Sequence, residues 1–163
     1  MSALSFKLTR DDISRALTHL AATAKKPEPI FRAMGTTFLS LTMGNFKNAE
    51  YRPSPWSPKK DGTAAKLQKS GTLSRSFHLE VTDHSATVGS PMIYAAIHQF
   101  GGTIKGNPKL RFQWAPGRWA TVSQVTIPAR PFFPVANGHL TPKAEEKIKA
   151  AAERALARQA AGK

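Results

Sequence analysis

The chain has 163 residues, with 24 Lys plus Arg against 10 Asp plus Glu and no cysteine. This length suits one compact domain, so we expect a single domain over residues 1–163 that needs no disulfide or metal for stability. The lack of cysteine excludes disulfides, thiolate zinc sites and cysteine nucleophiles. The net charge of +14 predicts an anionic partner, such as nucleic acid, anionic lipid or an acidic protein surface.

The positive charge is not confined to one tail. The excess is +3 over residues 1–50, +5 over 51–110 and +6 over 111–163. No apolar run approaches the roughly 18–20 residues that a membrane helix needs, and the N-terminus lacks the apolar core of a secretory signal. We therefore expect a soluble protein that acts where it is made.

Two helices are expected in the first third of the chain. Thr9 can cap the first, which runs with apolar residues at three- and four-residue spacing to about Ala24 and ends before Pro27 and Pro29. The second runs from about Pro29 to Phe46. Its apolar stripe consists of Ile30, Met34, Phe38 and Leu41.

Residues 47–66 are predicted to form a long proline-rich surface loop anchored by the indole of Trp56. A loop of this length is usually functional or disordered. Both alternatives stay open: a loop that orders on a partner, or a floppy insertion.

The middle of the chain has the pattern of strands. After a turn or short helix broken at Gly71, alternating residues predict a strand over 77–82 and a return strand over 86–89. Ser90 and Pro91 indicate the start of a helix over 92–99 that stops at the two glycines 101–102. A second hairpin is expected, with strands over 110–114 and 119–127.

Residues 128–134 contain three prolines, so they are expected to run extended across a surface without a strand ladder. Thr141 and Pro142 then predict the cap and first turn of a C-terminal helix to about residue 160. The order of elements indicates an α+β fold: an antiparallel sheet packed with N-terminal helices, a short central helix and a C-terminal helix, with a long proline-rich loop.

An enzymatic function finds little support. The five histidines form no metal-binding pair on one helix, and the adjacent carboxylates Asp11–Asp12 and Glu145–Glu146 are better explained as charges at helix starts. Nucleophile elbows, P-loops and dinucleotide fingerprints are missing. We expect no catalytic residue, no cofactor and no metal.

The second hairpin interleaves basic and aromatic residues, as nucleic-acid binders do. In a strand, Arg111 and Gln113 lie on one face, and Phe112 and Trp114 on the other. A platform that stacks bases needs cations and aromatics on the same face, so the alternation favours core aromatics with a solvated basic face. Electrostatic contact with a DNA backbone remains open.

Two segments are left that composition does not explain: residues 94–102 (Tyr-Ala-Ala-Ile-His-Gln-Phe-Gly-Gly) and 128–132 (Pro-Ala-Arg-Pro-Phe). Each has a plain structural interpretation, in which His98 and Gln99 brace a turn and Arg130 pairs with a carboxylate. In order, and preceded by Leu-x-x-x-Gly-x-Leu-x-x-Ser at 67–76, they resemble the virion morphogenesis family of tailed bacteriophages. These are the tail-completion or neck proteins of Mu-like and P2-like phages.

The resemblance covers roughly residues 10–160. It implies a non-enzymatic component of the head–tail junction that assembles as a ring, six-fold to match a tail tube. The implied partners are copies of itself and the connector, stopper, tail terminator or tube. The implied location is the virion, after assembly in the host cytoplasm and without a membrane. The resemblance assigns no role to residues 103–126.

Ring assembly is head-to-tail, so each subunit presents two different patches. Segment 128–134 suits one patch, and loop 47–66 could supply the other by draping over a neighbour. Arginine and aromatic side chains dominate interface hot spots, which favours Arg130, Phe132 and Trp56 as anchors. The full set of candidate interface residues is Trp56, His98, Gln99, Phe100, Gly101, Gly102, Pro128, Arg130, Pro131 and Phe132.

The candidate contacts to a DNA channel or an acidic partner are Lys59, Lys60, Lys105, Lys109, Arg111 and Arg118. The alternative function is a basic nucleic-acid-associated protein without a structural role in the virion. The two differ in salt dependence, because DNA binding weakens steeply with salt whereas a ring held by apolar anchors does not.

Overall fold

A computed structural model describes residues 4–8, 26–59, 62–68 and 70–161. A three-stranded antiparallel sheet forms one layer, in the order β1 (Leu4–Leu8), β3 (Ser85–Ser90), β2 (His78–Thr82). Phe6 pairs with Val88, which pairs in turn with Leu79. Cross-strand partners share a face, so these side chains form one apolar surface on the sheet.

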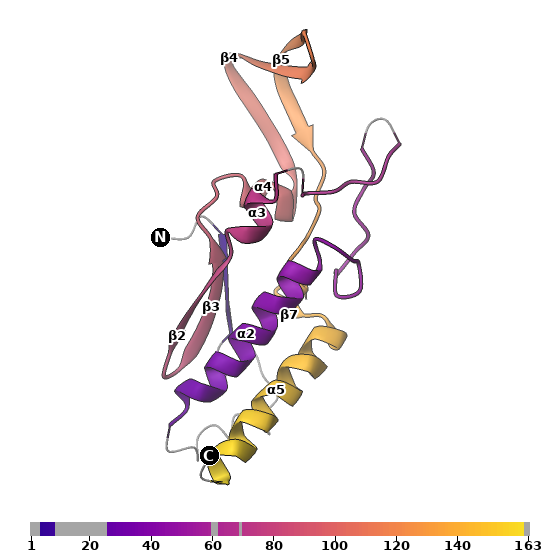
Figure 1. The fold of residues 1–163 in the computed structure, drawn as a ribbon. Helices are drawn as coiled ribbons and strands as arrows, with labels where there is room; N and C mark the ends of the chain where they lie inside the picture. Colours follow the sequence, from indigo (N-terminus) through magenta and orange to yellow (C-terminus); the bar gives the residue numbers. More distant parts are fainter. Residues whose placement is uncertain (1–3, 9–25, 60–61, 69, 162–163) are drawn as a thin grey trace.

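Helix α2 (Glu28–Gly44) packs against that apolar surface, and helix α5 (Pro142–Ala160) packs against α2 (Figure 1). The buried residues of α2 recur at helical spacing, as the sequence predicts. They include Ile30, Met34 and Phe38. Gly35 explains the close approach, since a Cβ placed there would lie 2.5 Å from Leu79 Cδ1. The glycine costs helix propensity but brings helix and sheet together.

Aromatic rings fill the centre of the core. Phe38 stacks on Phe6 with ring centroids 5.0 Å apart, and Phe132 stacks on Phe46 at 5.2 Å. Phe77 meets Phe132 edge-on at 5.2 Å. Offset and edge-to-face pairs of this kind add stability beyond the area that they bury.

Three short elements complete the body: α3 (Thr72–Arg75), α4 (Ala95–Phe100), and a small hairpin of β6 (Val135–Ala136) and β7 (His139–Leu140). A long hairpin of β4 (Gly102–Ala115) and β5 (Arg118–Ile127) extends away from the body at the top of Figure 1. Within the described ranges, its two strands pair only with each other.

The sequence predictions are confirmed for the α+β class, the antiparallel sheet, α2, the β2–β3 hairpin and α5. The second hairpin is also present, but β4 begins at Gly102, eight residues before the predicted start at Leu110. The predicted helix between Thr9 and Ala24 lies outside the described residues. Strand β1 was not predicted, although Leu4, Phe6 and Leu8 alternate with polar residues.

Three local predictions are wrong. Helix α4 begins at Ala95, three residues after the predicted Met92; the residues between form a turn in which the Ala95 N–H donates to the Met92 carbonyl at 2.9 Å. Helix α5 starts where predicted, but the Thr141 side chain does not cap it. Residues 131–134 are buried and do not run across the surface, because they cross the aromatic core.

Candidate functional site

The two segments singled out in the sequence lie side by side. The Oε1 atom of Gln99, near the end of α4, accepts hydrogen bonds from the backbone N–H groups of Phe132 at 3.0 Å and Phe133 at 3.1 Å. The Arg130 N–H donates to the carbonyl of His98 at 2.7 Å. The plain interpretation had His98 and Gln99 brace the turn that follows the helix; in the structure they bind the backbone of the proline-rich segment.

The same segment is bound from its other side. Asn45, just after α2, donates from Nδ2 to the Phe132 carbonyl at 2.9 Å, and Trp56 donates from Nε1 to the Pro131 carbonyl at 2.8 Å. Side chains thereby satisfy buried backbone groups that a proline-rich strand cannot pair in a ladder.

Gly101 makes the crossing possible. Its φ of +72° lies in the left-handed region, and a Cβ there would stand 2.7 Å from the backbone nitrogen of Ala129. Only glycine meets both demands without strain. The His-Gln-Phe-Gly-Gly and Pro-Ala-Arg-Pro-Phe motifs are therefore explained by their contact with each other.

Burial changes the interpretation of several candidate anchors. Phe132 is 0% exposed and Gln99 is 6% exposed, and Pro131 is also buried. Phe132 was expected to be an interface anchor, but its ring lies in the core and cannot touch a neighbouring molecule in this conformation. Gly102, Pro128 and Phe100 are exposed, and their interface role stays a prediction.

Trp56 also packs within its own chain. Its half-buried ring meets Phe46 edge-on at 6.0 Å, and the Arg52 guanidinium carbon lies 3.6 Å from the ring centroid. Burial lowers the pKa of Arg52, whose Nε donates to the Asn45 carbonyl at 2.7 Å. The predicted indole anchor of the loop is confirmed, and the indole anchors it to its own domain.

Arg130 joins the loop to the proline-rich segment. Its Nε donates to the carbonyl of Ser57 at 3.1 Å, and its NH2 group donates to the carbonyl of Pro58 at 3.4 Å. The plain interpretation had given this guanidinium a carboxylate partner, whereas the structure gives it backbone carbonyls. Burial lowers the pKa of His98, and the nearby positive charge of Arg130 lowers it further.

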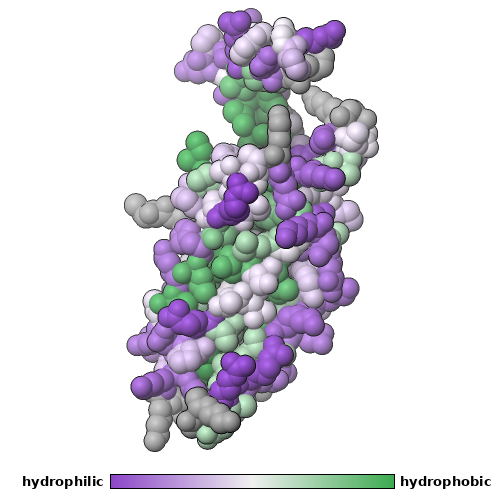
Figure 2. All heavy atoms as spheres, in the orientation of Figure 1, coloured by the Kyte–Doolittle hydropathy of each residue, from purple (hydrophilic) through white to green (hydrophobic). Residues whose placement is uncertain are grey.

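Several large apolar side chains are strongly exposed, and of these the sequence analysis named only Phe100 as a candidate interface residue. Ile93 is 89% exposed, Phe100 70% and Trp119 56%, and Ile104 and Phe112 are close to 40%. They lie on the turn before α4, at its last residue, and on the long hairpin. Figure 2 shows hydrophobic atoms gathered where this hairpin joins the body.

The candidate cationic residues lie mainly on the same hairpin. Lys105, Lys109, Arg111 and Arg118 are all exposed there, and Lys59 is exposed on the proline-rich loop. Lys60 and the side chain of Trp114 lie outside the described part of the chain. No Asp or Glu occurs between Asp83 and Glu145, a stretch that holds six Lys and Arg residues.

Phe112 is not a core aromatic, contrary to the sequence interpretation. It is 39% exposed, on a ribbon whose strands pair with no other described strand. The predicted separation of Arg111 from Phe112 holds, since Arg111 pairs with Thr121 and Phe112 with Ala120. Trp119 lies on the Arg111 face, where the guanidinium carbon is 5.0 Å from the ring centroid.

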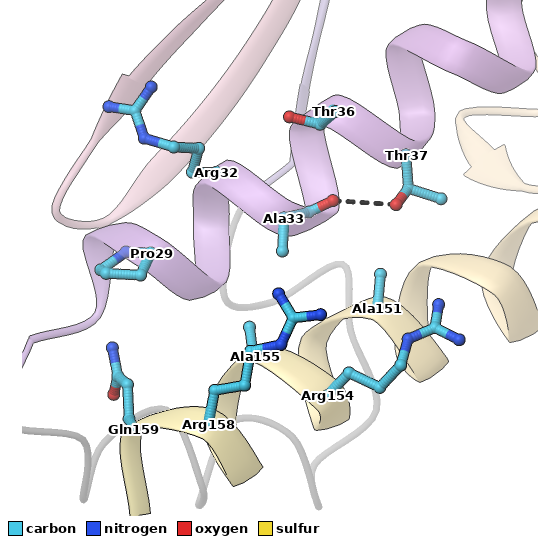
Figure 3. Close-up of a pocket in the computed structure, with 10 residues that line it drawn as sticks. All are labelled: Pro29, Arg32, Ala33, Thr36, Thr37, Ala151, Arg154, Ala155, Arg158 and Gln159. Carbon is cyan, nitrogen blue, oxygen red and sulfur yellow. Dashed lines mark hydrogen bonds between the residues drawn. The ribbon is translucent and has the colours of Figure 1, made fainter. Parts of the chain in front are cut away.

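A groove of about 450 Å³ runs between α2 and α5. Figure 3 shows small side chains, Ala33, Ala151 and Ala155, between the two helices. Arg154 and Arg158 of α5 line the same groove, which is basic and open.

In the described part of the chain, no cluster of three or more His, Asp or Glu side chains is arranged to hold a metal ion. Nor does any described helix combine the length and apolarity that crossing a bilayer requires.

These features define a compact α+β protein with an exposed basic and apolar hairpin, a surface suited to assembly. The sequence profile of the phage virion morphogenesis family matches residues 8–157, and the chain belongs to that family. It is 32% identical over 137 residues to Mu-like prophage FluMu G protein 2 of Haemophilus influenzae, a match that covers 84% of this chain and 83% of that protein. No solved structure matches the chain.

Proposed function

We propose that this chain is a structural component of the head–tail junction of a tailed phage, where copies form a ring that joins tail to head around the DNA channel. The observation that carries the proposal is the family match, which extends over residues 8–157. The relative from a Mu-like prophage supports the same assignment. The family description concerns virion morphogenesis and names no catalytic activity.

The surface of the protein supports assembly. Large apolar side chains such as Ile93 and Phe100 face solvent at one end of the body, and exposed patches of this kind mark interaction sites. Their partners in the proposal are other copies of the chain and the neighbouring connector, stopper, terminator or tube proteins.

The charge supports a position next to DNA. The stretch from His84 to Ala144 carries cations and no anions, and the long hairpin within it exposes four of them. In a ring, such cations can line a channel and neutralise DNA phosphates, whose attraction does not depend on base sequence.

The second candidate is a nucleic-acid-associated protein without a structural role in the virion. The observation in its favour is that Arg111 and Trp119 share one exposed face of a two-stranded ribbon. A ribbon of this kind fits the major groove of DNA. The family match favours the virion component.

The two functions are separated by measuring mass by light scattering at low and high salt, after nucleic acid has been removed. The proposal predicts a ring of roughly six subunits of 17.7 kDa that persists at high salt, because apolar contacts are not screened. A monomer at both salts that binds duplex DNA steeply less well as salt rises would support the alternative.

A further inference from the structure

The long β4–β5 hairpin is built in a way that requires a partner. An isolated two-stranded hairpin is marginally stable in water, and these strands make no ladder with any other described strand. The hairpin nevertheless carries large apolar residues that stay partly exposed. A partner that covers one of its faces would remove this exposure.

The two faces of the hairpin differ in chemistry near its tip. The strand register places Leu110 opposite Val122 and Phe112 opposite Ala120, so these four residues share one face, called here the apolar face. Arg111, which pairs with Thr121, lies on the other. The hairpin tip is therefore apolar on one side and cationic on the other.

A hollow of matching chemistry lies at the base of the hairpin, next to β1. It has a volume of about 580 Å³, and none of the residues that line it is charged. Its apolar wall is formed by Phe6, Pro53, Phe100, Pro131, Phe133 and Val135. Aromatic and proline side chains make a rigid, weakly hydrated surface that suits another aromatic ring.

We propose that the apolar face of the hairpin of one copy binds in this hollow on a second copy of the chain. The inference rests on the proposed self-assembly and names the contact that would produce it. A hairpin cannot fill its own hollow: the β5 partners of Gly102 and Phe112, Ile127 and Ala120, stand seven residues apart, roughly 23 Å along the ladder at about 3.3 Å per residue.

The contact is head-to-tail, because each copy gives a hairpin on one side and a hollow on the other. Such heterologous contacts close into rings when the rotation between copies allows it. The cationic face, with Arg111 and Trp119, stays free of this contact and is available for DNA or an acidic neighbour.

The size of the contact predicts how assembly behaves. Because β4 bulges between Lys105 and Leu110, the paired ribbon has the length of the ten residues of β5: it is about 33 Å long and about 10 Å wide, so one face offers at most roughly 330 Å². The total buried by a pair is then at most about 660 Å², below the roughly 1,200 Å² that a stable, specific interface buries. We therefore expect isolated pairs to dissociate readily and a closed ring, in which every copy makes two contacts, to be the stable species.

Because the natural chain has no cysteine, introduced cysteines can report the contact directly. One chain carries Phe112→Cys and a second, larger tagged chain carries Ser54→Cys; Ser54 is exposed and lines the hollow. The two are mixed and oxidised, so that any mixed disulfide joins two copies. The matched control replaces the first variant by Gln113→Cys, the next residue along the strand and on the opposite face.

We expect at least about tenfold more mixed disulfide from the Phe112→Cys chain than from the Gln113→Cys chain. A second control, Ser40→Cys on the exposed side of α2, should give no mixed disulfide with Phe112→Cys. Equal yields from the two hairpin variants would overturn the proposal. So would a predominance of disulfides between two Phe112→Cys chains, which would place two hairpins against each other.

The mass of the unmodified protein distinguishes failure of the hairpin–hollow contact from failure of the proposed self-assembly. A ring without the mixed disulfide would leave the proposed self-assembly standing and remove this contact from it. A monomer at every concentration and salt, with no mixed disulfide, would overturn both. Protection of the Phe112→Cys thiol from alkylation by duplex DNA, with no protection by a second copy, would assign the apolar face to DNA and reject the inference.

Discussion

Replacing Gln99 with methionine tests how the proline-rich segment is held in the core. The side chain is 6% exposed, and its Oε1 accepts hydrogen bonds from the N–H groups of both Phe132 and Phe133. Methionine keeps a similar volume but accepts neither bond. A buried N–H without a partner costs about 1–3 kcal/mol, so the free energy of unfolding should fall by roughly 2–5 kcal/mol.

Urea denaturation followed by circular dichroism measures this loss. With an m-value of about 2 kcal/mol/M, the midpoint should move down by roughly 1–2.5 M. Gln124→Met, on the exposed surface of β5, is the control and should leave the midpoint unchanged. Gln99→Glu, which keeps an acceptor oxygen at the position of Oε1, should recover part of the loss. An unchanged midpoint for Gln99→Met would refute the assigned role of these two bonds.

Three other variants test the same region. Gly101→Ala should destabilise more than Gly138→Ala in thermal unfolding, since both have positive φ but only Gly101 faces backbone at 2.7 Å; equal losses would contradict this. Trp56→Phe should lose about 1–2 kcal/mol by leaving a carbonyl unpaired, whereas Trp119→Phe, on an exposed ring, should change stability by less than about 0.5 kcal/mol. Because the folded-state pKa of His98 is lowered, its neutral form is favoured; stability is full above the unfolded pKa of 6.5 and falls as pH drops toward the folded pKa. Denaturation between about pH 5 and 7 should therefore show a flatter pH dependence for His98→Gln than for the natural chain, and identical slopes would reject this.

Local periodicity was enough to predict the elements whose pattern is long or strongly alternating. The buried stripe of α2 and the alternation in β2 both follow directly from the sequence. Strand β1 is only five residues long and pairs with β3 about 80 residues away, so no local signal fixes it. Helix α4 starts later than predicted, because residues 92–95 form a turn closed by the Ala95 N–H on the Met92 carbonyl.

The candidate site shows the limit of sequence patterns more clearly. The sequence shows residues 94–102 and 128–132 as two motifs in a fixed order. It predicts neither their contact in space nor the burial of Phe132. An aromatic residue beside prolines looks the same in sequence whether it faces a neighbour or the core. Conversely, Phe112 alternates like a core residue and is 39% exposed, on a ribbon whose strands pair with no other described strand.

The exposure of Ile93, just before α4, was missed for a related reason. Ile93 precedes a short segment rich in alanine and isoleucine, whose plain interpretation is a core helix. Only the tertiary arrangement shows that the helix directs Gln99 inward and leaves Phe100 outside. The surface proposed for assembly therefore consists of the hairpin and the hollow at its base, which segment 128–134 lines through Pro131 and Phe133.

The most direct test of the central claim is the location of the protein on phage particles. Purified virions labelled with an antibody or gold-tagged protein can be imaged by electron microscopy. We predict label concentrated at the junction between head and tail, consistent with a ring at that position. Virions without label, or label distributed over the head surface or along the tail shaft, would contradict the proposed function.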